Sequence, residues 1–123
     1  MKILLDTHVL IWYSEGNQML SKKWIEIIEN PLHQKYFSYV SLWEMNIKIS
    51  VGKLTLEVNS PIEIVPKEIE ILQPTLSALD ILSKLPMHHR DPFDRMIIAQ
   101  AISNNFLLMS NDGNFEKYPV ELV

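Results

Sequence analysis

The chain has 123 residues, of which 47% are apolar and 21% are charged. That length and composition fit one globular domain with a single hydrophobic core and show no signature of disorder. The absence of cysteine excludes a disulfide framework and a thiolate metal site. The formal net charge of −4, from 11 basic and 15 acidic residues, argues against a protein that holds nucleic acid on a broad basic face.

The first twelve residues, MKILLDTHVLIW, carry a charged aspartate within their apolar run and no cleavage site of small residues, so they do not resemble a signal peptide. No apolar run approaches the roughly 18 residues that a membrane-spanning helix needs. We therefore expect a soluble, cytoplasmic protein that forms one domain over residues 1–123.

Short apolar runs that predict strands alternate with segments of helical periodicity along the first half of the chain. The expected elements are, in order, a strand over residues 2–5, a helix that starts near residue 9 and stops near residues 16–17, a helix after Ser21 that ends at Pro31, a strand over residues 35–40 and a helix over residues 41–50.

The second half continues the alternation after an ambiguous segment, residues 54–66, where PIEIVPKEI is compatible with a short helix. We expect a strand over residues 69–74, a helix capped by Thr75 that ends at Pro86, a helix from residue 92, a buried strand over residues 106–110, a turn and a last short strand, PVELV. This order predicts an α/β fold with a short, mostly parallel sheet flanked by helices on both faces.

Four acidic residues follow or face the predicted strand ends. Asp6 follows the first strand, Glu44 starts the helix after the second, and Asp112 follows the strand over residues 106–110. Asp94 lies in the helix before that strand, and we expect it to face the other three. Converging carboxylates repel one another unless a cation lies between them, so the set predicts a site for a hard divalent metal, Mg²⁺ or Mn²⁺.

Each of these acids also fits an ordinary capping role. Asp91 before a proline fits a helix N-cap, which places Asp94 at the third helical position, and the two acids would favour the helix dipole. Residues 41–44, SLWE, fit a capping box, Asp6 fits a cap after the first strand, and Asp112 before a glycine fits a turn. Sequence alone leaves open whether the acids form a site or only cap helices.

Two hydroxyl residues lie beside the candidate acids. Thr7 and Ser110 are placed to orient a metal-bound water, although both are also ordinary polar residues at strand ends. The histidines lack the spacing of a zinc site, and His88–His89 predict a solvated loop. We expect four basic side chains near the acids to lie at the solvated surface: Lys48, Lys53, Arg90 and Arg95. We expect the three tryptophans to lie in the core: Trp12, Trp24 and Trp43.

Four segments follow one another along the chain, in the order LLDTHVLIW, SYVSLWEMNIKISVGKL, HHRDPFDRMIIAQA and LLMSND. Together they resemble the PIN-domain ribonucleases of the VapC type, the toxin halves of bacterial and archaeal type II toxin–antitoxin modules. The resemblance covers essentially the whole chain. It implies a three-layer PIN domain that uses Mg²⁺ or Mn²⁺ to cleave RNA, often tRNA or ribosomal RNA, that typically dimerises, and that a cognate antitoxin silences.

The resemblance also implies which residues act. The four metal-binding acids of the family match Asp6, Glu44, Asp94 and Asp112, while Asp91 belongs to a DPFDR variant as a cap or outer ligand. The departures from the family pattern are small: a serine stands at position 110 where threonine is frequent, and MIIAQA replaces IAAQA. Because no side chain here suits covalent attack, the favoured route is hydrolysis by a metal-activated water.

Three alternatives remain beside this metal-dependent endoribonuclease. A catalytically silent PIN-like module that binds RNA or protein would lack one or more of the acids, and none is missing. A receiver domain needs an acidic pair near the first strand, where LLDTH supplies a single acid. The third alternative, in which all four acids are caps, is tested by metal binding.

Overall fold

β1 (Lys2–Leu5) runs through the middle of a four-stranded sheet in the computed structural model, which describes residues 1–123. The strand order is β3-β2-β1-β4, with β2 at Gln34–Ser38, β3 at Glu70–Leu72 and β4 at Leu107–Met109. All three pairings are parallel, and Leu4 lies opposite Tyr36 on one side and Leu108 on the other. The predicted parallel α/β sheet is therefore confirmed.

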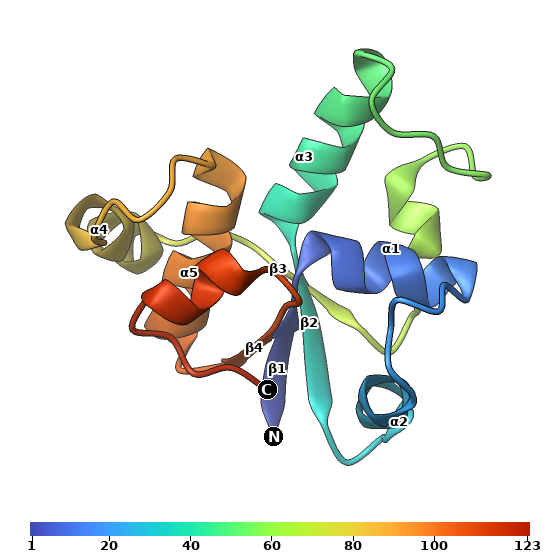
Figure 1. Cartoon of the computed structure of the whole chain (residues 1–123), viewed down its shortest axis with the longest axis horizontal. Helices are drawn as coiled ribbons and strands as arrows, with labels where there is room; N and C mark the ends of the chain where they lie inside the picture. The colour runs from blue at the N-terminus through green and yellow to red at the C-terminus, as the bar shows by residue number, and fades with distance from the viewer.

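Helices cover both faces of this sheet (Figure 1). α4 and α5 lie on one side, α1 and α2 on the other, and α3 extends from the carboxyl end of β2. This is the predicted three-layer arrangement. The bounds are Thr7–Glu15 for α1, Lys22–Glu29 for α2, Tyr39–Ser50 for α3, Leu76–Lys84 for α4 and Pro92–Asn104 for α5, with short 3₁₀ helices η1 (Pro61–Ile64) and η2 (Gly113–Lys117).

The central strand contributes to two separate cores. Successive side chains of a strand point to opposite faces, so Leu4 packs in the core beneath α4 and α5, whereas Ile3 and Leu5 pack in the core beneath α1 and α2. All three side chains are fully buried. Burial on both faces explains why this strand is a continuous apolar run rather than an alternating one.

α5 is buried over most of its length, including a polar residue, Gln100. Its amide accepts a hydrogen bond from the Ser38 hydroxyl and donates one to the backbone carbonyl of Leu72, 3.3 Å away. These bonds join α5 to the carboxyl ends of β2 and β3. They satisfy a polar group that would be costly to bury unpaired.

The boundary between β2 and α3 differs from the prediction. The strand ends at Ser38, and the helix begins at Tyr39 rather than at residue 41. The Ser38 hydroxyl accepts a hydrogen bond from the backbone N–H of Val40 at 3.0 Å, which makes Ser38 the N-cap. The predicted capping box over residues 41–44 is therefore wrong. Ser41 and Glu44 lie within the helix, and their side chains are free to contact other segments.

One face of α3 exposes an apolar stripe, which we define as Tyr39, Trp43, Ile47 and Val51. The spacing of four residues places these side chains along one line of the helix, and between 38% and 59% of each is exposed. The core position predicted for Trp43 is therefore wrong, whereas Trp12 and Trp24 pack against the core beneath α1 and α2.

The last predicted strand and the two connecting segments form only short elements. The segment PVELV forms a single bridge, between Leu122 and Leu108, rather than a strand. The ambiguous segment contains the short helix η1, and the turn after β4 continues into η2. None of the helices has both the length and the apolar character required to cross a bilayer.

Candidate functional site

Asp6 occupies the junction of β1 and α1, where it is 5% exposed. Its backbone is extended and its Oδ1 accepts a hydrogen bond from the Thr7 N–H at 2.8 Å, which confirms the predicted cap. Its Oδ2 accepts a second bond from the Ser110 hydroxyl at 2.9 Å. Burial raises the pKa of Asp6 to about 6, although both hydrogen bonds oppose that rise.

Glu44 reaches the same edge from the second turn of α3 and is 3% exposed. Its Oε1 accepts a hydrogen bond from the Thr7 hydroxyl at 3.0 Å. Because that hydroxyl has one proton, it must accept from Ser41, whose Oγ lies 2.7 Å away. The chain of hydroxyls fixes Glu44 against the start of α1.

Lys48 lies one helical turn beyond Glu44, and its Nζ is 3.0 Å from Glu44 Oε2. Burial lowers the pKa of Lys48, but the bond to Glu44 and the negative charges of Glu44, Asp91 and Asp94 outweigh it, so the pKa is raised overall. Lys48 is thus a half-buried ion-pair partner of a candidate acid rather than a purely solvated side chain.

Asp94 lies in the first turn of α5. Asp91 caps this helix, as predicted, by accepting hydrogen bonds from the backbone N–H groups of Phe93 and Asp94 at 2.9 and 3.0 Å. The Asp94 carboxyl group has one hydrogen-bond partner, His89, whose Nε2 lies 3.3 Å from Asp94 Oδ2.

The pKa of Asp94 rises to about 8. Burial is the largest cause, followed by the negative charges of Asp6, Asp91, Glu44 and Asp112. Asp94 therefore lies close enough to the other three predicted site acids to be affected by their charges. The sheet topology brings these four acids to one edge from segments far apart in the sequence.

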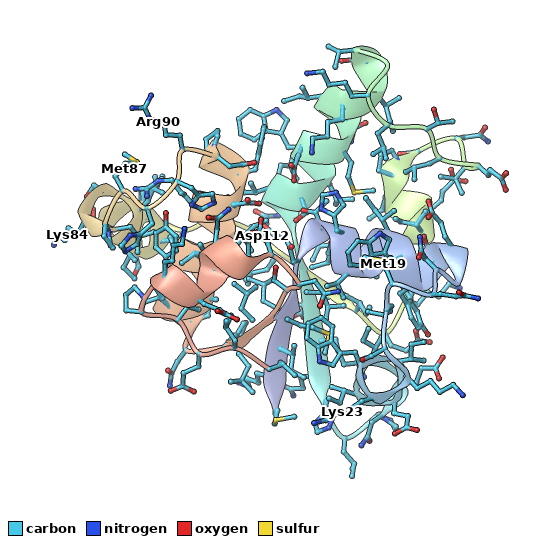
Figure 2. All side chains as sticks on the ribbon, in the orientation of Figure 1. Met19, Lys23, Lys84, Met87, Arg90 and Asp112 are labelled. Carbon is cyan, nitrogen blue, oxygen red and sulfur yellow. The ribbon has the colours of Figure 1, made fainter.

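Asp112 is the exposed member of the set. Its Oδ1 caps η2 by accepting a hydrogen bond from the Asn114 N–H at 2.9 Å, and its own N–H donates to Ser110 Oγ at 3.0 Å. Figure 2 shows Asp112 in the middle of the view. A shallow pocket of about 240 Å³ adjoins it, lined by Asp6, His8, Trp12, Asn111 and Asp112.

The donor chemistry of these acids fits a hard divalent cation. All are oxygen ligands. Burial is the largest cause of the raised pKa values of Asp6 and Asp94, neighbouring carboxylates add to it, and a bound cation would favour the ionised form of both. As the side chains are oriented, no three or more carboxylate or imidazole groups are arranged around one point to coordinate an ion. The structure thus brings the predicted acids to one edge of the sheet without gathering them into a coordination shell.

A second group of residues beside Asp94 was not predicted. His89 is half-buried rather than solvated, and its ring bonds both Asp94 and the hydroxyl of Tyr118. Arg95 is 7% exposed and donates to Tyr118 and to backbone carbonyls, so the predicted solvated position is wrong. The one sequence signal for Arg95 was its place inside an apolar helix. Arg90, in contrast, points outward in Figure 2 as predicted.

The PIN domain family model matches residues 3–121. The chain belongs to the PIN-domain family. A sequence comparison with curated proteins gave no significant match. The family assignment thus agrees with the resemblance that the four sequence segments indicate.

Several solved structures share this PIN-domain fold. VapBC2 from Rickettsia felis bound to a promoter DNA fragment has a TM-score of 0.79 at 18% identity, covering 100% of this chain and 98% of that chain. DNA-bound VapBC from Salmonella typhimurium has a TM-score of 0.71 at 16% identity, with 100% and 97% covered. A toxin–antitoxin complex from Klebsiella pneumoniae has a TM-score of 0.67 at 18% identity, with 98% and 96% covered.

Proposed function

We propose that this PIN-domain protein is a metal-dependent endoribonuclease and the toxin component of a toxin–antitoxin pair. The observation that carries the proposal is the pair Asp6 and Asp94. Both are poorly exposed and have raised pKa values, and the charges of Glu44 and Asp112 act on Asp94. A protein gains no stability from gathering such charges, so a functional cation is the simplest reason for their arrangement.

Asp6 and Asp94 would be the principal ligands of Mg²⁺ or Mn²⁺, and Glu44 and Asp112 would complete the shell directly or through water. When bound, the ion would supply a Lewis acid for the attacking water and for the phosphodiester. The chain's own residues supply the positioning. Thr7 N–H and Ser110 Oγ fix the two oxygens of Asp6, and the Thr7 hydroxyl fixes Glu44.

The proposed substrate is RNA, with tRNA and ribosomal RNA as the first candidates. The acidic net charge fits an enzyme that contacts a limited stretch of substrate better than one that binds nucleic acid on a broad basic face. Lys48 is the basic side chain nearest to the acids, and it becomes available to a phosphate if a metal ion takes its place beside Glu44.

The proposed partners are an antitoxin and a second copy of the chain. The solved neighbours are VapBC and toxin–antitoxin complexes, which supports an antitoxin for this protein too. The apolar stripe on α3 supports a protein partner because contiguous apolar surface of this kind is seldom left exposed.

The test is cleavage of defined tRNAs and ribosomal RNA by the purified protein with Mn²⁺, with Mg²⁺ and with EDTA. Asp6→Asn, purified in parallel, controls for a contaminating nuclease. We expect cleavage with either metal, none in EDTA and none by the variant. Cleavage in EDTA, or no cleavage of any RNA in the panel with Mn²⁺, would refute the proposal.

A further inference from the structure

The segment between α4 and α5 carries an imidazole that contacts the candidate site. His89 Nε2 lies 3.3 Å from Asp94 Oδ2, and His89 Nδ1 lies 2.7 Å from the hydroxyl oxygen of Tyr118. The backbone N–H of His89 donates to the same hydroxyl at 3.1 Å. Both the ring and the backbone of His89 are therefore held by one buried tyrosine.

The partners of Tyr118 determine where its proton goes. Its hydroxyl oxygen accepts from the His89 N–H and from Arg95 Nη1, which lies 3.3 Å away. These two donors occupy its lone pairs, so the hydroxyl proton can go to either of two acceptors, His89 Nδ1 at 2.7 Å or the His89 carbonyl oxygen at 3.5 Å. The much shorter contact with Nδ1 is the stronger hydrogen bond, and we assign the proton to it. A neutral imidazole that accepts at Nδ1 carries its hydrogen at Nε2, and Nε2 is the atom that faces Asp94.

Arg95 anchors this chain of hydrogen bonds. Its Nη1 donates to the Pro86 carbonyl at 2.8 Å, and its Nη2 lies 3.5 Å from the carbonyls of Leu82 and Leu85. The guanidinium therefore holds the C-terminal end of α4 and the hydroxyl of Tyr118 in one place. Tyr118 and Arg95 are both more than nine-tenths buried.

We propose that His89 is a positioning residue for Asp94, fixed by Tyr118 and Arg95. Its Nε2–H holds Oδ2, the only hydrogen bond to that carboxylate, and so sets the direction of the other oxygen. The inference rests on the proposed function in assigning Asp94 to the metal site. Hydrogen-bond partners behind metal ligands fix ligand orientation, and their loss typically costs about 10–100-fold in metal affinity or activity.

The hydrogen bond itself is tested without metal or activity. In ¹⁵N-labelled, metal-free protein, we expect one imidazole N–H proton at an Nε2 position to exchange slowly enough to be observed. It should be absent from His89→Gln, which assigns it, and broadened in Tyr118→Phe, which removes the donor to Nδ1. A neutral His89 that carries its hydrogen at Nδ1 would overturn the inference.

The effect on the site is tested by RNA cleavage and by thermal stabilisation with increasing Mn²⁺. His89→Ala should lower cleavage about 10–100-fold and shift the Mn²⁺ dependence of stabilisation to higher concentration. His89→Gln retains a donor of similar reach and should recover most of both. The matched control is His88→Ala, which removes an exposed ring that packs on Tyr118 but contacts no acid, and it should behave as wild type.

Three results would contradict the role of His89. The first is cleavage by His89→Ala at the wild-type rate, and the second is an equal loss of cleavage in His89→Ala and His89→Gln. The third is a His89→Ala protein that is less stable in EDTA but has the wild-type dependence of stabilisation on Mn²⁺, which would indicate a purely structural residue. If the wild type neither cleaves RNA nor gains stability with Mn²⁺, the proposed function fails instead. The imidazole signal then still decides whether His89 holds Asp94.

Discussion

The junction of β1 with α1 and the first turn of α5 each carry a poorly exposed aspartate, but they hold it differently. Asp6 accepts two hydrogen bonds from fixed donors, Thr7 and Ser110, and burial raises its pKa to about 6. Asp94 is somewhat more exposed and accepts one hydrogen bond, from His89. Its pKa nevertheless rises further, to about 8.

Depth of burial alone therefore does not determine the pKa of these two carboxyl groups. The donors around Asp6 stabilise its carboxylate, whereas Asp94 faces the negative charges of Asp6, Asp91, Glu44 and Asp112 with a single donor. In the metal-free protein, Asp94 is therefore the acid most ready to keep its proton. It is also the acid whose ionisation a cation would favour most.

The largest expected effect is on cleavage. Asp94→Asn should lower the rate of RNA cleavage at least about 100-fold, because it removes a group that positions the metal and the reacting water. The measurement is initial cleavage rate at saturating Mn²⁺. Asp80→Asn, an exposed aspartate on α4, is the matched control and should retain full activity. Full activity in Asp94→Asn would show that Asp94 is only a helix residue and that the site is misplaced.

The second effect is on stability in the presence of metal. Binding to the folded state alone should stabilise the wild type by about 2.7 kcal/mol when Mn²⁺ exceeds its dissociation constant 100-fold. Asp94→Asn and Asp6→Asn should each gain much less, because each lacks a principal ligand. Thermal melts with EDTA and with excess Mn²⁺ measure the difference. Equal gains in all three proteins would mean that Mn²⁺ binds elsewhere.

The third effect is on the pH dependence of folding stability, which should differ between Asp6 and Asp94. A folded-state pKa above the unfolded value means that the folded protein binds a proton that the unfolded chain releases, so stability falls as pH rises. For Asp6 the fall lies between about pH 4 and pH 6, and for Asp94 it continues to about pH 8.

Denaturant unfolding in EDTA from pH 4 to pH 9 measures both intervals. In Asp94→Asn, the free energy of unfolding should change little between pH 6 and pH 8. At pH 8 this variant should be more stable than the wild type by about 1 kcal/mol, after allowance for solvent screening. Asp6→Asn should flatten the interval below pH 6. Because the charge of Asp6 also raises the pKa of Asp94, this variant should in addition end the Asp94 interval at a lower pH than in the wild type. If Asp94→Asn is destabilised at every pH, the repulsion inferred at α5 is absent.

The smallest effect tests the donors around Asp6. Ser110→Ala removes one of the two hydrogen bonds that oppose the rise in the pKa of Asp6, and it should lower stability at pH 8 by about 1 kcal/mol. With one donor fewer, the pKa of Asp6 should rise above 6. The fall in unfolding free energy that Asp6 causes should therefore continue to a higher pH, as it does for Asp94. Ser103→Ala, whose exposed hydroxyl bonds Ser77, is the control. Identical pH curves for Ser110→Ala and wild type would contradict the proposed part of Ser110.

The elements of the fold that depend on local sequence could be predicted. Asp6 after an apolar run and Asp91 before a proline are caps that need only neighbouring residues, and both are confirmed. The parallel sheet follows from the alternation of short apolar runs with amphipathic segments. The functional roles of Asp6, Glu44, Asp94 and Asp112 remain predictions, although the topology brings all four to the same edge.

Features that depend on tertiary contacts could not be predicted. Ser38 and Ser41 are both good N-cap residues, and they differ in their tertiary partners. The N-cap, Ser38, also bonds Gln100, which is 62 residues away, whereas Ser41 contacts Thr7, which is 34 residues away. The contact of His89 with Tyr118 likewise joins residues 29 apart. No periodicity or spacing marks such pairs. Ser38 contacts Gln100 only when α5 packs against the end of β2, and His89 contacts Tyr118 only when the segment that follows η2 packs beside α5.

The pairing of β1 with β4 has a consequence for how the protein is made. The backbone N–H of Asp6 donates to the carbonyl of Met109, and Ser110 completes the hydrogen bonds of Asp6 across 104 positions of sequence. At ordinary rates of synthesis, roughly 5–20 s separate these residues on the ribosome. A nascent or prematurely terminated chain that ends before β4 contains Asp6 and the pairing of β1 with β2. It lacks the second partner strand of β1 and the residues after β4 that pack against α5. Translation therefore delays the assembly of the acidic edge until nearly all of these residues have been made.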